Sequence, residues 1–171
     1  MTSLSVVPEV QEYARESDHW DFPIFKVLAN NDTGAAPGHQ GGIVVPKVLS
    51  RYFPELEGTP TETHPTVETW IDAELFDGDR YLATVTTRYQ FQTWGAKRSE
   101  ERRLTGQLKP LRDLAQGGDV LLIRRRRNHA DRYRLTLVRR ISQAFPEVDR
   151  LVSGRRWGVL TRAPVPVSRG R

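Results

Sequence analysis

A long β-hairpin near the middle of the chain constrains the fold most. Residues 66–76 (TVETWIDAELF) and 79–91 (DRYLATVTTRYQF) both have strand composition, and the Asp-Gly-Asp at 77–79 between them is typical of a tight turn. The turn joins consecutive strands directly, without a crossover helix. The chain is therefore expected to contain antiparallel β-structure.

Other segments add shorter strands and a few short helices. Strand composition recurs at residues 22–29, 43–46, 120–127, 132–140 and 156–161. Helical patterns cover residues 8–18 and 47–53, and a further short helix after residue 108 ends at Gly117 and Gly118. Six or seven strands without strand–helix alternation predict a mainly β domain, a mixed antiparallel barrel or sandwich.

The charge of the chain is divided very unevenly along its length. Residues 1–96 contain 6 Lys and Arg against 14 Asp and Glu, whereas residues 97–140 contain 14 against 5 and residues 141–171 contain 6 against 2. A concentration of basic residues is the electrostatic footprint of a polyanion binder, because each phosphate contact releases a condensed counterion. Charge alone does not separate DNA from RNA or an acidic protein.

Several function classes are disfavoured by composition. The sequence has no Cys, and its four His residues lie far apart without zinc-ligand spacing, so neither a metal nor another cofactor is expected. The N-terminal residues turn acidic where a signal peptide would turn apolar, and no segment reaches the roughly 18 apolar residues of a membrane span. We expect a cytoplasmic protein.

The segment at residues 30–42 (NNDTGAAPGHQGG) is a long loop rich in glycine and hydrogen-bonding side chains. Asn and Gln can pair with adenine through two hydrogen bonds, and His can donate to guanine, so the composition suits the reading of base edges. The same residues are equally typical of a solvated linker whose Asn, Asp and Gly form turns. Composition leaves both interpretations open.

A second polar segment lies at residues 93–105 (TWGAKRSEERRLT), where Trp94 and a Gly precede two basic pairs separated by two glutamates. Its Arg and Lys side chains suit phosphates or guanine, and a Glu can accept from cytosine N4. Mixed charges at this spacing also occur on an exposed helical turn. We see no strand periodicity in residues 92–104.

Two other sets of residues suggest nucleic-acid contacts but have simpler explanations. Arg124–Arg127 form the densest basic run, yet alternate side chains of a strand point to opposite faces, so we expect a solvated edge with some phosphate contact. Trp70 and Trp157 lie in apolar strand contexts, and we expect both in the core rather than stacked on bases.

No catalytic motif is visible in the sequence. Asp72 and Glu74 lack the following lysine of a two-metal nuclease element, and the chain has no P-loop, no G-x-G-x-x-G and no assignable nucleophile with its base. We therefore expect a binding protein rather than an enzyme. A compact nuclease using His39 with Glu101 is the main alternative, and an RNA-binding or protein-interaction domain is a third.

Two motifs make the sequence similar to a known family. Residues 25–56 contain Asn-Asp-Thr-Gly followed by His-Gln-x-Gly, a strand, a Pro and a short helix, and residues 95–105 read GAKRSEERRLT. Both resemble the N-terminal effector domain of EcoRII-like restriction endonucleases, over roughly residues 20–160. The resemblance implies a DNA-binding pseudobarrel of about seven strands, in which two loop arms grip the major groove of double-stranded DNA and a nuclease domain or subunit is an associated partner.

The resemblance also implies which residues bind DNA. In the first loop and just after it these are Asn31, Asp32, Thr33, His39, Gln40 and Lys47. In the second they are Lys97, Arg98, Glu101, Arg102, Arg103 and Thr105, and we add Trp94 as an aromatic candidate from the same segment. One extra residue in the second motif leaves Glu100 and Glu101 as alternatives, and Val44 replaces a family Tyr, so the target sequence is expected to differ.

The expected domain organisation follows from these motifs. Residues 1–19 form an N-terminal extension, residues 20–162 form the pseudobarrel, and residues 163–171 form a disordered basic tail. The family's enzyme carries a separate nuclease domain that nothing in this sequence matches. The chain is thus either an effector domain of a longer enzyme or a freestanding reader that acts beside a nuclease.

Overall fold

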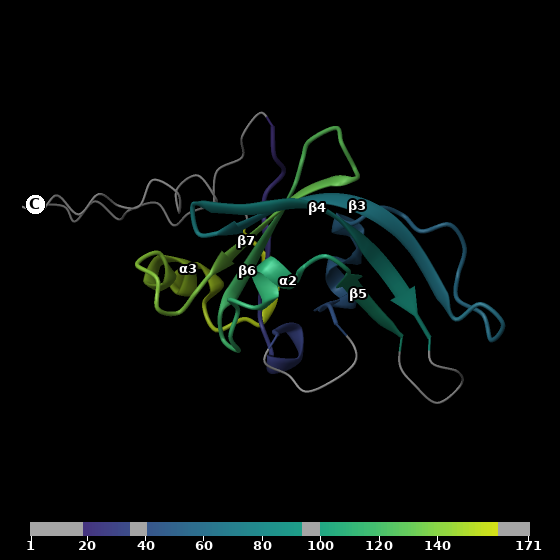
Figure 1. The fold of residues 1–171 in the computed structure, drawn as a ribbon, viewed down its shortest axis with the longest axis horizontal. Helices are drawn as coiled ribbons and strands as arrows, with labels where there is room; N and C mark the ends of the chain where they lie inside the picture. The colour runs from purple at the N-terminus through teal and green to yellow at the C-terminus, as the bar shows by residue number, and fades with distance from the viewer. Residues whose placement is uncertain (1–18, 35–40, 94–99, 161–171) are drawn as a thin grey trace, which may run out of the picture.

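A computed structural model describes residues 19–34, 41–93 and 100–160. Its strands form a single eight-stranded sheet in the order β2-β5-β4-β3-β7-β6-β1-β8, in which every neighbouring pair is antiparallel except β3 and β7. The strands are β1 Ile24–Val27, β2 Ile43–Val45, β3 Thr66–Asp77, β4 Arg80–Gln92, β5 Glu101–Thr105, β6 Val120–Arg125, β7 Arg132–Val138 and β8 Trp157–Val159. The sheet curls into a half-barrel, which confirms the predicted mainly β fold (Figure 1).

The hairpin of β3 and β4, which the sequence predicted, is the longest pairing of the sheet. The two strands pair from Thr66 with Gln92 to Asp77 with Arg80, and Gly78 takes a φ of 60° in the turn between them. A left-handed φ at the turn suits glycine, which has no Cβ to clash with the backbone. A register shift between Leu75 and Phe76 marks a β-bulge that bends the hairpin.

The main core fills the inside of the curl. Alternate residues Ile71, Ala73 and Leu75 of β3 are buried there, as the two-residue repeat of a strand requires. Phe53 inserts from the segment after β2 and stacks between two tyrosine rings, with centroids 4.8 Å from Tyr89 and 5.3 Å from Tyr133. Aromatic packing of this kind fixes the segment between β2 and β3 to the inner face of the sheet.

A smaller core lies on the outer face. There α3 (Phe145–Val152) places Val148 and Val152 against Phe25 of β1 and Leu122 of β6. This helix was missing from the sequence-based prediction, although its buried residues follow the i, i+4 spacing of an amphipathic helix. The other helices are short: η1 Asn30–Asp32, η2 Lys47–Tyr52 and α2 Lys109–Arg112.

Four further predictions about elements and burial are wrong or incomplete. Residues 101–105 form β5 instead of continuing an irregular segment. Trp70 and Trp157 are 56% and 42% exposed rather than buried, and Trp70 stacks with the Arg88 guanidinium 5.6 Å from its ring centroid. The helix expected at residues 47–53 is present but is a 3-10 helix.

The arginine run Arg124–Arg127, which begins within β6, is also not a solvated edge. Arg124 is only 3% exposed, and Arg125 bonds to Asp21 at 2.7 Å across the sheet end. The helix expected at residues 8–18 and the tail at residues 163–171 lie outside the described residues. Of the helices that the structure describes, none is both long and apolar enough to cross a membrane.

Candidate nucleic-acid interface

The two loops singled out in the sequence start from opposite ends of one pair of strands. We call residues 30–42 the first arm and residues 93–105 the second arm. β2 and β5 are antiparallel, with Ile43 opposite Leu104 and Val45 opposite Arg102. The first arm thus enters β2 beside the end of β5, and the second arm enters β5 at its beginning. The two bases lie at opposite ends of β5, four residues apart, which corresponds to about 14 Å at the rise of an extended strand.

Both arm bases lie along the same edge of the molecule, the lower one in Figure 1, where η1 and the joined ends of β4 and β5 are found. Direct contacts tie the two bases to the strand pair. The Thr105 hydroxyl donates to the Gly41 carbonyl at 2.9 Å, and the exposed Lys47 and Glu100 side chains lie 3.6 Å apart. The fold therefore brings two segments 60 residues apart in sequence onto one edge.

Asp32 anchors the first arm from inside the protein. Its carboxylate accepts hydrogen bonds from the Lys26 ammonium at 2.8 Å, the Val44 amide at 2.9 Å and the Ala29 amide at 2.9 Å. Asp32 is 1% exposed. Burial lowers the pKa of Lys26 below its ordinary value, and the adjacent Asp32 carboxylate opposes that shift. The Asp32 side chain links β1, η1 and β2 and does not face solvent.

Arg112 of α2 holds the same arm from the other side. Its Nε and Nη2 donate to the carbonyls of Asp32 and Thr33, both at 3.0 Å, and its own carbonyl accepts from the Gly34 amide at 2.9 Å. A Cβ on Gly34 would lie 2.9 Å from the Asp113 carboxylate, and one on Gly41 would lie 3.2 Å from Arg112 Nη1. The close approach, which at Gly34 also includes the Arg112 backbone carbonyl at 3.2 Å, explains the glycine at position 34, whereas at Gly41 the neighbour is the flexible end of the Arg112 side chain. Sequence reasoning missed Arg112, because no local pattern marks it.

In β5 the two central arginines point to opposite faces. The Arg102 guanidinium lies on the inner side, 4.1 Å from the Phe91 ring centroid, whereas Arg103 on the outer side pairs with Glu101 at 2.7 Å. Arg102 also lines a pocket of about 460 Å³ together with Tyr89 and the segment after η2. The two arginines therefore present separate surfaces at the base of the second arm.

The remaining residues expected to bind DNA divide into three groups. Asn31 and Lys47 are exposed near the arm bases. Thr33 is buried, and its hydroxyl donates to the Asn30 carbonyl at 2.8 Å. The others lie outside the described residues, so the structure does not place them: His39, Gln40, Trp94, Lys97 and Arg98.

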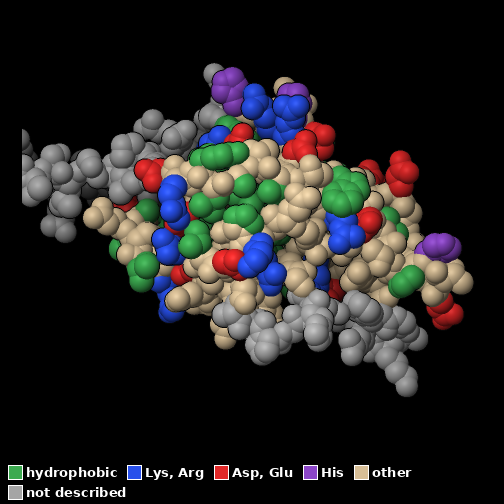
Figure 2. All heavy atoms as spheres, in the orientation of Figure 1, with side chains coloured by type: hydrophobic (Ala, Val, Ile, Leu, Met, Phe, Trp, Pro, Cys, Tyr) green, Lys and Arg blue, Asp and Glu red, His purple; other side chains and the backbone are tan. Residues whose placement is uncertain are grey.

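On the face drawn in Figure 2, charged side chains form several groups rather than one stripe. Figure 2 shows Lys and Arg side chains in separate clusters interspersed with Asp and Glu over this face. Among the described residues, no group of three or more His, Asp and Glu side chains is placed to hold a metal ion. On this face, charge alone thus does not locate an interface, and the shared edge of the two arms is the more specific feature.

A curled β domain with a basic C-terminal half and two loop bases on one edge has the architecture of a barrel-like DNA-binding domain. Comparison with protein families agrees: the profile described as "Restriction endonuclease EcoRII, N-terminal" matches residues 20–144. The chain belongs to this family, which confirms the resemblance seen in the sequence and implies a DNA-binding effector role in restriction systems. A search of curated proteins finds no match.

Proposed function

We propose that this domain binds a specific double-stranded DNA sequence by placing its two arms in the major groove. The observation that carries the proposal is the position of the arm bases, on one edge and about 14 Å apart along β5. That spacing is comparable with the roughly 12 Å width of the major groove. Family membership supports DNA as the ligand.

The chemistry of the side chains suggests which residues of each arm contact bases and which contact phosphates. In the first arm Asn31, His39 and Gln40 carry the donors and acceptors that read base edges, and Lys47 is suited to a phosphate. In the second arm the basic pair at 97–98, Arg102 and Arg103 suit guanine or phosphate, while Glu101 either accepts from cytosine N4 or orients Arg103. Asp32 and Thr33 support the arm from within.

We further propose that the domain recognises DNA and leaves cleavage to a nuclease domain or subunit. The absence of a nuclease motif from the sequence supports this division, as does the family name, which refers to the N-terminal part of a larger enzyme. Incubation with magnesium and supercoiled plasmid tests it. Intact plasmid is expected, and nicking or linearisation that is lost in His39→Ala would favour the compact nuclease instead.

Selection from a randomised duplex pool at about 0.15 M salt is the decisive experiment, because nonspecific phosphate attraction is weakened there. We expect enrichment of one motif of several base pairs. Arg103→Ala should then reduce affinity for that motif by about 1–3 kcal/mol and relax the preference at one position. Enrichment of nothing, with binding that disappears as salt rises, would reduce the domain to a generic basic surface.

A further inference from the structure

A small pocket beside the base of the first arm has the composition of an anion site. It has a volume of about 240 Å³ and lies between the segment after α2 and the turn that follows β7. Its lining residues are Leu114, Gln116, Asp119, Arg139, Arg140 and Ile141. Whether the pocket can bind an anion depends on which of its two adjacent arginines, Arg139 and Arg140, already has a carboxylate partner in the protein.

Arg139 and Asp119 already have partners within the protein, an ion pair for Arg139 and backbone amides for Asp119. Arg139 Nε and Nη2 donate to the two carboxylate oxygens of Asp77 at 3.1 and 2.9 Å. Asp119 is 3% exposed, and its oxygens accept from the amides of Arg140 and Gln116 at 2.9 and 2.8 Å. The carboxylate of Asp119 therefore braces the backbone of the pocket, and among the described residues it forms no ion pair with Arg139 or Arg140.

Arg140 is the second arginine of the pocket, and it differs from Arg139 in its partners. Its side chain is exposed, and among the residues that the structure describes no carboxylate pairs with its guanidinium. The Arg140 side chain runs across Gly118, where an added Cβ would lie 3.1 Å from Arg140 Cδ and Nε. Gly118 has a φ of +92°, so this position favours glycine both for its backbone and for the space it leaves to the arginine.

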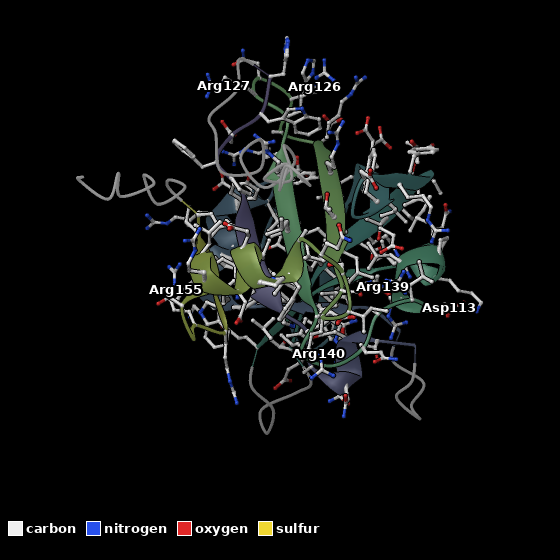
Figure 3. The ribbon with its side chains drawn as sticks, turned by 90° about the vertical axis from the view of Figure 1, so that its left-hand side faces the viewer. Asp113, Arg126, Arg127, Arg139, Arg140 and Arg155 are labelled. Atoms are coloured by element: carbon white, nitrogen blue, oxygen red, sulfur yellow. The ribbon has the colours of Figure 1, made fainter. Side chains whose placement is uncertain are left out.

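The pocket adjoins the first arm through a short chain of contacts. Gly118 donates to the Leu28 carbonyl at 2.8 Å just before η1, and a Cβ on Gly117 would lie 2.4 Å from the Asn30 side-chain oxygen. Figure 3 shows Arg140 at the lower end of the molecule beside η1, with Arg126 and Arg127 at the opposite end. Arg140 thus lies at the end from which the first arm extends.

We propose that Arg140 and this pocket bind a backbone phosphate of the DNA that the arms read. The inference rests on the proposed function and adds to it a third, sequence-independent contact from the turn after β7. A guanidinium with free donors at a partly enclosed site suits a phosphate oxygen. Ile141, which is 85% exposed at the rim, would lie against the adjoining deoxyribose.

The test is the salt dependence of binding for wild type and Arg140→Ala, measured on the selected duplex and on a shuffled one. The slope of log affinity against log salt is negative, and loss of one phosphate contact should reduce its magnitude by about 0.9. The ratio of wild-type affinity to Arg140→Ala affinity should therefore shrink by about 3.5-fold between roughly 0.05 and 0.2 M salt, equally on both duplexes. Arg140→Lys should retain most of the slope.

Arg132→Ala is the matched control, because Arg132 is an exposed arginine in the pocket beside Arg126 at the opposite end of the molecule. It should leave the slope unchanged. If wild type prefers its selected site and Arg140→Ala keeps the full slope, this inference is wrong while the proposed function stands. If wild type shows no preferred site, the proposed function itself fails, whatever Arg140 does.

A second measurement separates DNA from free phosphate as the source of the anion. The arginine side-chain ¹⁵N resonance that disappears in Arg140→Ala should shift when duplex is added. Millimolar inorganic phosphate or a mononucleotide should leave it in place. Saturation by free phosphate together with an unchanged salt slope would overturn the assignment to the DNA backbone.

Discussion

At the scale of single residues, the first arm contrasts a buried anchor with an exposed neighbour. Asp32 and Asn31 are adjacent and both have side chains suited to base recognition, yet only Asn31 reaches solvent. The Asp32 carboxylate is enclosed by the Lys26 ammonium and two backbone amides. Neighbouring positions in one motif therefore have different environments: the Asp32 side chain is held inside the protein, whereas the Asn31 side chain is open to solvent.

Replacing Asp32 should test this division. Asp32→Asn leaves the Lys26 ammonium buried without its anion and should cost about 3–5 kcal/mol of unfolding free energy, measured by urea denaturation. Adding Lys26→Met should recover part of that loss, since the two residues interact directly. Asn31→Ala should change stability by less than about 0.5 kcal/mol and weaken specific DNA binding instead. A fully stable Asp32→Asn that loses only DNA affinity would mean that Asp32 contacts DNA directly.

At the scale of elements, the sequence predicted strands that show hydrophobic alternation and missed one that does not. The hairpin of β3 and β4 alternates clearly, and its bounds agree within about two residues. β5 has charged residues on both faces, and its inner face contributes Leu104 and the stem of Arg102 over Phe91. No local pattern reports that β5 is a strand, because its neighbours β2 and β4 supply the rest of the buried surface.

The candidate site divides in the same way. The residue types of both arms could be recognised in the sequence, whereas Arg112 and Arg140 could not. Each depends on a contact across the fold: Arg112 on the Asp32 carbonyl, 80 residues away, and Arg140 on the turn at Gly118. Long-range partners of this kind are fixed by the tertiary structure and leave no periodicity in the sequence.

The α2 helix should influence DNA recognition through Arg112 alone. Arg112→Lys keeps the charge but loses the planar fork that reaches two carbonyls of the first arm. Two lost hydrogen bonds predict about 1–2 kcal/mol lower stability and a roughly tenfold loss of affinity for the selected duplex, with little change on a shuffled one. The readouts are urea denaturation and equilibrium binding.

Lys109→Ala provides the control within the same helix. Lys109 is exposed, and its one ion pair within the described part of the chain is with Asp113, at 2.6 Å, just beyond the end of α2. An exposed pair of this kind contributes little, so stability and specific affinity should both stay close to wild type. Equal losses in the two variants would show that α2 acts through general charge rather than by holding the arm.

At the scale of the whole molecule, buried tyrosines should set the alkaline limit of stability. Tyr52 donates to the Phe22 carbonyl at 2.7 Å and accepts from the Arg125 amide at 2.8 Å, which joins η2 to β6 and to the segment just before β1. Burial raises the pKa of Tyr52 to about 12, and burial raises that of Tyr133 as well. Both hydroxyls lie in the aromatic cluster around Phe53 at the closed part of the curl.

The sign of the effect follows from proton binding. Below pH 10 both states keep the Tyr52 proton, so its full contribution to stability is present. Above pH 10 the unfolded state releases the proton first, and stability falls until the folded state releases it near pH 12. Lys26 acts in the opposite direction below its ordinary pKa of 10.5, because its lowered pKa makes the folded state the poorer proton binder.

We therefore expect the urea midpoint to fall steeply between about pH 10 and 12, with Tyr52 alone accounting for roughly 3 kcal/mol at the upper end. Tyr52→Phe should be less stable than wild type near neutral pH by about 1–3 kcal/mol, since two backbone groups lose their partner. Above pH 10 the unfolding free energies of wild type and Tyr52→Phe should converge, because the variant has no proton to lose at that position. Tyr81→Phe, which removes an exposed hydroxyl, should leave the shape of the wild-type profile unchanged. Parallel curves for wild type and Tyr52→Phe up to pH 12 would show that alkaline unfolding begins elsewhere in the sheet.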